Sequence, residues 1–266
     1  MKFCRFICPM LSSVGIALLA LTAPAAIAQG TTTQGASSGN VLGLLSTAFS
    51  SGNPVQQVQL SGNAIWYAGS LEDTGTVTLT ASAGGSSQMQ LLLAATGQRT
   101  ETQTGTGLNT SCQWAGADGV AHQVDFGNCW KSAQWFLPAL SLYPASLPSN
   151  LSIVDLGMNM ISTTGSDTNV YRHLQSQLVI SSLPSNVAAI VAQNNTADLG
   201  LNPASLLPTI YAYSVHPDNG AQTLIAIEIH YSDYHTVNGV KIPFTIQRYV
   251  NGALQLHISV NSAQIN

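Results

Sequence analysis

The chain has 266 residues, enough to bury a full hydrophobic core, but only 7% of them are charged against roughly 25% in an average soluble protein. This composition excludes a coiled coil and a disordered chain kept extended by its charge. Seven Lys/Arg against eleven Asp/Glu, with no basic run, also argue against a nucleic-acid partner, which needs a positively charged surface.

The N-terminus has the three parts of a secretory signal. Lys2 and Arg5 precede an apolar run over residues 14–23, and the small-x-small triplet Ala26-Ile27-Ala28 follows it. We therefore predict a signal peptide over residues 1–28 and an extracytoplasmic protein, periplasmic or secreted. The apolar run is shorter than the roughly 20 residues of a spanning helix, so we expect no integral membrane segment after cleavage. A retained anchor is the alternative.

Signal cleavage leaves two cysteines, Cys112 and Cys129, seventeen positions apart. In an exported chain two cysteines most simply form one disulfide, which we predict here. Free thiols or metal ligands are the alternatives, but a zinc site needs more Cys or His partners at short spacing, and only His122 lies nearby.

The N-terminal half of the mature chain changes from helical to alternating spacing. Residues 29–40 are polar and predict a flexible leader, and residues 41–266 are expected to form a single domain. Apolar residues at helical spacing over 41–49 predict an amphipathic helix. Alternation with a period of two over 55–105 predicts an antiparallel meander with one apolar face.

The C-terminal region predicts three more strands and two hairpins. Apolar alternation marks three segments, residues 225–231, 240–246 and 254–260. A two-residue turn at Asn238-Gly239 pairs Tyr231 with Ile246 and keeps both apolar sets on one face. The second hairpin keeps its apolar sets together only if a bulge is present. We predict a three-residue loop over 250–252, which pairs Ile246 with Leu256.

The sequence lacks the motifs of common catalytic sites, among them the G-x-S-x-G elbow, the phosphate-binding loop and the H-E-x-x-H helix. His230, Asp233 and His235 resemble a metal-binding set, but only Asp233 and His235 share a face of one strand, and two groups are too few. We therefore expect no enzyme activity, no metal and no cofactor. An exported hydrolase is the least favoured alternative.

Two segments carry a family resemblance. Residues 197–266, with DLGLNPASLLP, HPDNG and YSDYHTVNGVKIPFTIQRYVNGALQLHISVNSAQIN, resemble the C-terminal half of the outer-membrane lipoprotein carrier and receptor superfamily, which includes sensor domains of sigma-factor regulators. Residues 58–104, with GTVTLTAS and QLLLAATGQRTET, are similar to its N-terminal half. The resemblance implies an α+β fold: a strongly curved antiparallel sheet forming a half-open barrel, with helices covering the concave face. Residues 106–150 have no counterpart in the carriers.

The resemblance also implies a function, because the apolar concave face of the carriers receives acyl chains. It implies a non-catalytic binding protein for an apolar or acylated ligand, with an envelope lipoprotein or membrane partner. The lining expected from the alternating positions is Leu60, Trp66, Leu91, Leu93, Tyr231, Phe244, Ile246, Leu256 and Ile258.

The carriers use an arginine on the concave side, and Arg99 is the nearest candidate for such a polar anchor. The alternative for Arg99 is an exposed partner of Glu101. The competing hypothesis for the whole chain is a structural or interaction module of the cell envelope, with a fully packed barrel and no ligand.

Overall fold

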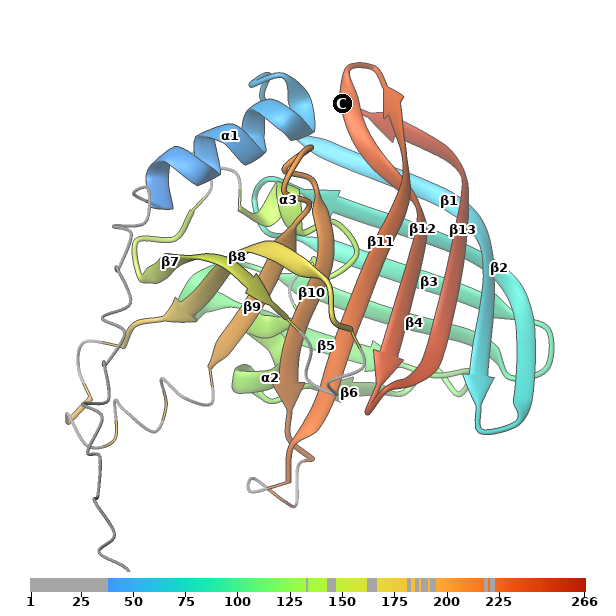
Figure 1. Cartoon of the computed structure of the whole chain (residues 1–266). Helices are drawn as coiled ribbons and strands as arrows, with labels where there is room; N and C mark the ends of the chain where they lie inside the picture. The colour runs from blue at the N-terminus through green and yellow to red at the C-terminus, as the bar shows by residue number, and fades with distance from the viewer. Residues whose placement is uncertain are drawn as a thin grey trace, which may run out of the picture. The chain divides into compact units, whose positions relative to one another are not determined.

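The computed structural model describes residues 38–132, 134–142, 147–161, 167–180, 183–184, 195–217 and 223–266, and the single residues 187, 191 and 220. The predicted signal peptide and most of the predicted leader lie outside these residues. Within residues 34–266, which form one compact unit, the main feature is an antiparallel sheet of thirteen described strands (Figure 1).

The sheet has two arms that meet where the first and last strands pair. The first arm contains β1 (Gln57–Ala68), β2 (Leu71–Ser82), β3 (Ser87–Leu93), β4 (Gly97–Thr104), β5 (Ser111–Ala115) and β6 (Ala121–Gln123). The second arm contains β7 (Leu151–Met160), β8 (Val170–Leu178), β9 (Thr196–Leu201), β10 (Pro208–Val215), β11 (Ile225–Val237), β12 (Val240–Val250) and β13 (Ala253–Ile265). The spatial order is β6-β5-β4-β3-β2-β1-β13-β12-β11-β10-β9-β8-β7, so every pairing except β1 with β13 joins chain neighbours.

Backbones approach closely at the junction of the arms. The register between β1 and β13 shifts at Ser61 and Gly62. A Cβ added at Gly62 would lie 2.1 Å from the carbonyl oxygen of Ser259, so a larger residue there would push the two strands apart.

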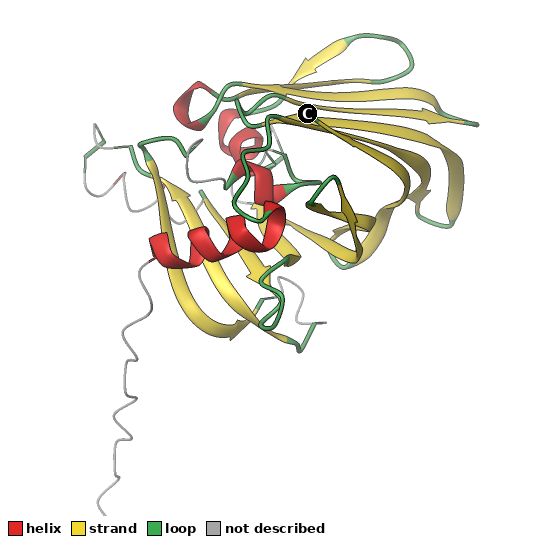
Figure 2. Cartoon of the chain, turned by 90° about the horizontal axis from the view of Figure 1, so that it is seen from above, coloured by secondary structure: helices red, strands yellow, loops and turns green. Residues whose placement is uncertain are grey.

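The described helices are few and short: α1 (Ser38–Ser50), α2 (Phe126–Lys131), α3 (Pro138–Ser141) and the 3-10 turn η1 (Gly107–Asn109). The described structure is therefore mostly β, which corrects the expected α+β class. The predicted helix over 41–49 is confirmed, although α1 begins three residues earlier, inside the predicted leader. Viewed from above, the helices gather on one side of the sheet (Figure 2).

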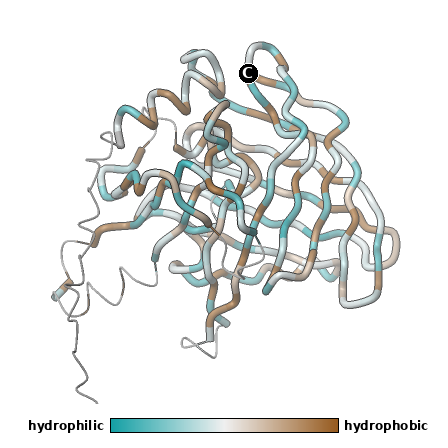
Figure 3. Tube along the Cα trace, viewed as in Figure 1, coloured by the Kyte–Doolittle hydropathy of each residue, from teal (hydrophilic) through white to brown (hydrophobic). Residues whose placement is uncertain are grey.

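Apolar and polar residues alternate along the strands, as the sequence predicts (Figure 3). In β2, Val77, Leu79 and Ala81 are buried and lie beside buried Leu91 and Met89 of β3. We call the face that carries these residues the inner face. It also receives the apolar side of α1, which buries Leu45 and Phe49. The inner face therefore forms one continuous core.

The sheet is open rather than barrel-like. Within the described part of the chain its edge strands β6 and β7 do not pair with each other, and the sheet is not rolled into the strongly curved half-barrel that the resemblance implies. It nevertheless bends. Glu101 on β4 and Arg248 on β12 are separated by four strands, a path of roughly 24 Å along the sheet, yet form an ion pair at 3.2 Å. The inner faces of the two arms thus meet through their side chains.

The structure confirms one predicted hairpin and corrects the other. Tyr231 pairs with Ile246 across the turn at Asn238-Gly239, as predicted. In the second hairpin Ile246 pairs with Ile258 rather than with Leu256. The turn has two residues, Asn251 and Gly252, both with positive φ, and the register shift lies between Arg248 and Tyr249. A bulge is therefore present, but inside the strand instead of in the loop.

The predicted disulfide between Cys112 and Cys129 is present, with a Cα–Cα distance of 5.5 Å. It ties β5 to α2, and α2 also contacts β10 of the other arm. There the Asn128 amide donates to the His216 carbonyl at 2.7 Å and accepts from the His216 amide at 2.9 Å. The helix is thus fastened to both arms. None of the helices in the described residues has the length and hydropathy needed to span a bilayer.

We expect the double variant Cys112→Ser/Cys129→Ser to lose about 3 kcal/mol of unfolding free energy, because the disulfide closes a loop of 17 positions. Urea unfolding of the oxidised wild type, the reduced wild type and the variant measures this loss. Reduced wild type should match the variant. Equal stability of all three forms would contradict a stabilising role.

Candidate functional site

A cavity of about 470 Å³ lies on the inner face between the two arms. One wall comes from β1, β3, β4 and β5, the opposite wall from β10 to β13, and the end from the segment that carries α2 and α3. We call that segment, residues 126–132 and 134–142, the plug segment. The apolar part of the lining is Trp66, Met89, Trp114, Val124, Trp135, Phe136, Val215, Ile225, Ile227 and Val250.

The charged side chains among the described lining residues are Arg99, Glu101 and Arg248. Arg99 and Glu101 reach the cavity because they pair with Leu91 and Met89 of β3, which puts both on the inner face. Glu101 bridges the two arginines: its Oε1 accepts from Arg99 Nε at 3.1 Å and its Oε2 from Arg248 Nη1 at 3.2 Å. The bridge joins β4 of one arm to β12 of the other.

Three tryptophans hold the guanidinium groups. Arg99 lies over the rings of Trp66 and Trp114, with its Cζ 5.2 and 4.7 Å from their centroids. The Cζ of Arg248 lies 5.5 Å from the centroid of Trp66 and 4.8 Å from that of Trp135. Trp66 thus contacts both arginines from the centre of the sheet. Such cation–π contacts fix the guanidinium planes and replace part of their hydration.

The electrostatics of the cluster favour an ionised Glu101. Burial raises the pKa of this carboxyl, but the charges of Arg248 and Arg99 outweigh burial, so the pKa lies below its usual value of 4.5. One carboxylate then faces two guanidiniums, and the cluster keeps one net positive charge. The Arg248 side chain is only 10% exposed, and its Nε has no hydrogen-bond partner among the described residues.

Buried tyrosines position the plug segment. The Tyr211 hydroxyl donates to the Lys131 carbonyl at 2.7 Å, and the Tyr231 hydroxyl donates to the Trp135 carbonyl. Burial raises the pKa of both tyrosines well above the ordinary value of 10, so they remain donors. From the first arm, Oε1 of Gln103 in β4 accepts a hydrogen bond from the backbone N–H of Gln134 at 3.0 Å. Trp135 is thereby fixed against Arg248.

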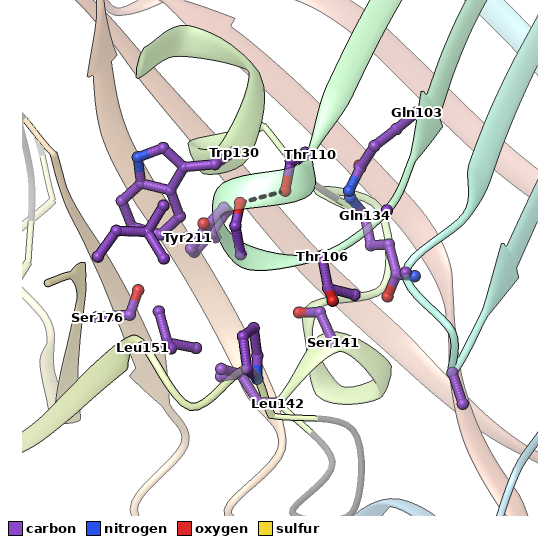
Figure 4. Close-up of a pocket in the computed structure, with 16 residues that line it drawn as sticks. Gln103, Thr106, Thr110, Trp130, Gln134, Ser141, Leu142, Leu151, Ser176 and Tyr211 are labelled. Carbon is purple, nitrogen blue, oxygen red and sulfur yellow. Dashed lines mark hydrogen bonds between the residues drawn. The ribbon is translucent and has the colours of Figure 1, made fainter. Parts of the chain in front are cut away.

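A second, smaller cavity of about 70 Å³ lies beside the plug segment (Figure 4). Its lining includes Trp130, Gln134 and Tyr211, and the Thr110 hydroxyl donates to the Gly107 carbonyl at 2.7 Å. Trp130 Nε1 and Gln134 Oε1 are buried without a partner among the described residues. This volume accommodates a few water molecules, which could satisfy those two atoms, but not an organic ligand.

The structure brings two of the residues predicted for the site, Trp66 and Arg99, to the large cavity. Arg99 lines the cavity and pairs with Glu101, but its side chain is half-buried, at 29% exposure, rather than the exposed partner that the alternative expects. The other predicted lining residues lie outside this cavity. Phe244 is partly buried and packs against the core, and the rest are buried within the core: Leu60, Leu91, Leu93, Tyr231, Ile246, Leu256 and Ile258. Helix α1 and the plug segment contribute side chains to the same core.

Sequence reasoning missed Arg248, Trp114 and Trp135, and it considered Glu101 only as a partner of Arg99. Arg248 has the same parity as Ile246, so the alternation could have placed it on the inner face. Trp135 lies outside any strand, where no alternation marks it.

The described residues contain no group of three or more His, Cys, Asp or Glu suited to a metal ion. His235 Nε2 instead lies 2.9 Å from Asp233 Oδ1, the local hydrogen bond that their shared face allows.

The geometry matches solved structures at low sequence identity. A LolA superfamily protein from Nitrosomonas europaea aligns over 87% of this chain and 94% of its own, with a TM-score of 0.51 and 11% identity. This chain has the LolA-type fold. A candidate outer-membrane lipoprotein-sorting protein domain from Vibrio parahaemolyticus covers 85% of this chain and 91% of its own, with a TM-score of 0.50 and 9% identity.

A DUF1329 family protein from Desulfovibrio piger has the same coverage, 85% of this chain and 91% of its own, at a TM-score of 0.51 and 8% identity. No protein-family model and no curated protein matches the sequence. The LolA-type fold therefore rests on structure alone, and it agrees with the resemblance noted in the sequence.

We expect Glu101→Gln to lower the free energy of unfolding at pH 7 by roughly 1 to 3 kcal/mol, because two guanidiniums lose their shared carboxylate. The folded pKa of Glu101 lies below the unfolded value, so the bridge stabilises above about pH 4.5 and is lost as the pH falls through the folded pKa. The difference from wild type should therefore shrink toward pH 3.

Urea unfolding at pH 7, 5 and 3 measures this effect, with Glu72→Gln on the exposed part of β2 as the matched control. A loss that is the same at all three pH values would show that the carboxylate charge is not responsible.

Proposed function

We propose that the protein is an exported, non-catalytic binding protein that holds an apolar or acylated ligand, a lipid or a lipoprotein acyl chain, on the inner face of its sheet. The observation that carries the proposal is the cavity of about 470 Å³ with its largely apolar and aromatic walls. Its volume lies within the range of roughly 300 to 1,000 Å³ typical of small-molecule sites. In this proposal the ligand lies between the two arms of the bent sheet, and the helices cover part of the inner face.

The binding energy comes from burying hydrocarbon. Each CH₂ group removed from water contributes about 0.8 kcal/mol, so an acyl chain binds without any covalent step. The ligand occupies the end of the inner face near Trp66, because the other end is filled by core side chains. Its chain would contact Met89 of β3 and Ile227 and Val250 of the opposite arm.

The proposed location is outside the cytoplasm, in the periplasm or in the medium. The disulfide between Cys112 and Cys129 supports it, because disulfides persist in oxidising compartments. The Vibrio parahaemolyticus domain is described as a candidate for lipoprotein sorting. By extension we propose an envelope lipoprotein or a membrane component as the partner that delivers or receives the ligand.

The competing hypothesis, an envelope interaction module with a filled interior, fits the structure less well, because the large cavity leaves the interior incompletely filled.

One feature of the sheet favours a contact surface for a partner protein, in addition to the cavity. The edge strand β7 exposes Val154, Leu156, Met158 and Met160. An apolar row on an edge strand is typical of a contact surface, and it is compatible with the exchange of a ligand between proteins.

We expect native mass spectrometry of protein purified from its own envelope to show added lipid mass. Val250→Trp, which puts a large ring into the cavity, should reduce the lipid-bound fraction at least about fivefold, since it removes space for hydrocarbon. Val120→Trp makes the same change on the exposed connection between β5 and β6, outside the cavity lining, and should leave that fraction unchanged. Absence of bound lipid in the wild type, or an equal loss in both variants, would contradict the proposal.

A further inference from the structure

We infer that the cavity selects amphiphiles with an anionic head group, which the guanidiniums of Arg99 and Arg248 bind while the hydrocarbon fills the apolar part. This inference rests on the proposed function and specifies the ligand's chemistry. The head group is a phosphate, sulfate or carboxylate, whether it belongs to a membrane lipid or to a free amphiphile.

Charge balance gives the first argument. The described lining residues carry two positive charges and one negative charge, so an anionic head group would complete the balance. A site with low-dielectric aromatic walls strengthens such attraction relative to water. A neutral amphiphile would gain only the hydrocarbon burial, and a cationic one would be repelled by the excess charge.

Unused hydrogen-bond donors give the second argument. A guanidinium has five N–H donors, and Glu101 takes one from Arg99 and one from Arg248. Arg248 is nine-tenths buried and its Nε lacks a partner among the described residues, so its donors are incompletely satisfied. Buried unsatisfied donors are costly, and the oxygens of an anion are the acceptors that match the planar guanidinium best.

The tryptophans give the third argument, because they hold the guanidiniums before a ligand arrives. Trp66 contacts both arginines, Trp114 of β5 contacts Arg99, and Trp135 of the plug segment contacts Arg248. Long side chains fixed in this way lose little freedom on binding, which increases affinity. The cluster is therefore an organised receptor rather than a pair of flexible surface charges.

Glu101 has a defined part in this site. Its carboxylate already accepts one N–H donor from each guanidinium, so it competes with the ligand's head group for these donors. Removing its charge should leave the cluster with two uncompensated guanidiniums and should strengthen the binding of an anion. The same carboxylate stabilises the ligand-free fold, because it neutralises one of two charges that would otherwise face each other.

The test compares three probes with the same twelve-carbon chain: dodecyl phosphate, dodecanol and dodecyltrimethylammonium. Binding below the micellar range is followed by the fluorescence of the tryptophans that line the cavity and by calorimetry. We expect dodecyl phosphate to bind at least about tenfold more tightly than dodecanol, and dodecyltrimethylammonium most weakly. Raising the salt from about 0.05 M to about 1 M should weaken the phosphate probe and leave the alcohol unchanged.

Variants localise the effect. Arg248→Gln and Arg99→Gln should each reduce the preference for phosphate over alcohol at least about fivefold, and Glu101→Gln should increase it. Lys241→Gln is the control, because it removes one positive charge from the β11–β12 hairpin, outside the cavity lining. Circular dichroism checks that each variant is folded. If a variant does not fold, the wild-type protein still tests the inference through its preference for phosphate over alcohol and the salt dependence of that preference.

The outcomes separate the two proposals. If all three probes bind wild type equally well, or the preference is independent of salt, the inference about the head group is wrong while the proposed function stands. Loss of the preference in Lys241→Gln to the same extent as in Arg248→Gln would likewise overturn it. If none of the probes binds, the proposed function itself fails.

Discussion

An antiparallel sheet with one apolar face must cover that face, and this requirement governs the structure. In the described part of the chain, three helices and one 3-10 turn cover only part of the inner face of the thirteen strands. The sheet therefore bends until its arms meet, with Glu101 of β4 held by Arg248 of β12. Where α1 and the plug segment reach, their side chains pack against the inner face. Beyond their reach, near Trp66, the space between the arms stays unfilled.

Much of the fold could be predicted from the sequence, because alternation is a local property. The strands of both meanders and the pairing of Tyr231 with Ile246 follow from period-two spacing and one Asn-Gly turn. The second hairpin was predicted with a bulge because its apolar sets had to share a face. The predicted position of that bulge, in the loop, is wrong, because Asn251 and Gly252 both adopt positive φ and close a two-residue turn. The shift needed to keep the face then falls at Arg248 and Tyr249.

The site was less predictable, because alternation identifies a face but not which part of it is covered. Leu91 and Ile258 have the same pattern as Trp66, yet they are fully buried in the core while Trp66 borders the cavity. The difference depends on where helices from other parts of the chain pack. Charges on the inner face are the more specific signal: Arg248 interrupts the apolar alternation of β12, Arg99 pairs with buried Leu91 of β3, and both arginines line the cavity.

The plug segment lies within residues 106–150, the part of the mature chain whose sequence shows no resemblance to the carriers. It is fastened to one arm by the disulfide and by the Gln134–Gln103 contact, and to the other arm by Tyr211 and Tyr231. Bonds to both arms make its position depend on the distance between them. Because Trp135 of this segment contacts Arg248, any ligand that separates the arms must also move an aromatic wall of its own site. In the proposed function, the chemistry of the ligand would therefore depend on the plug segment as much as on the sheet.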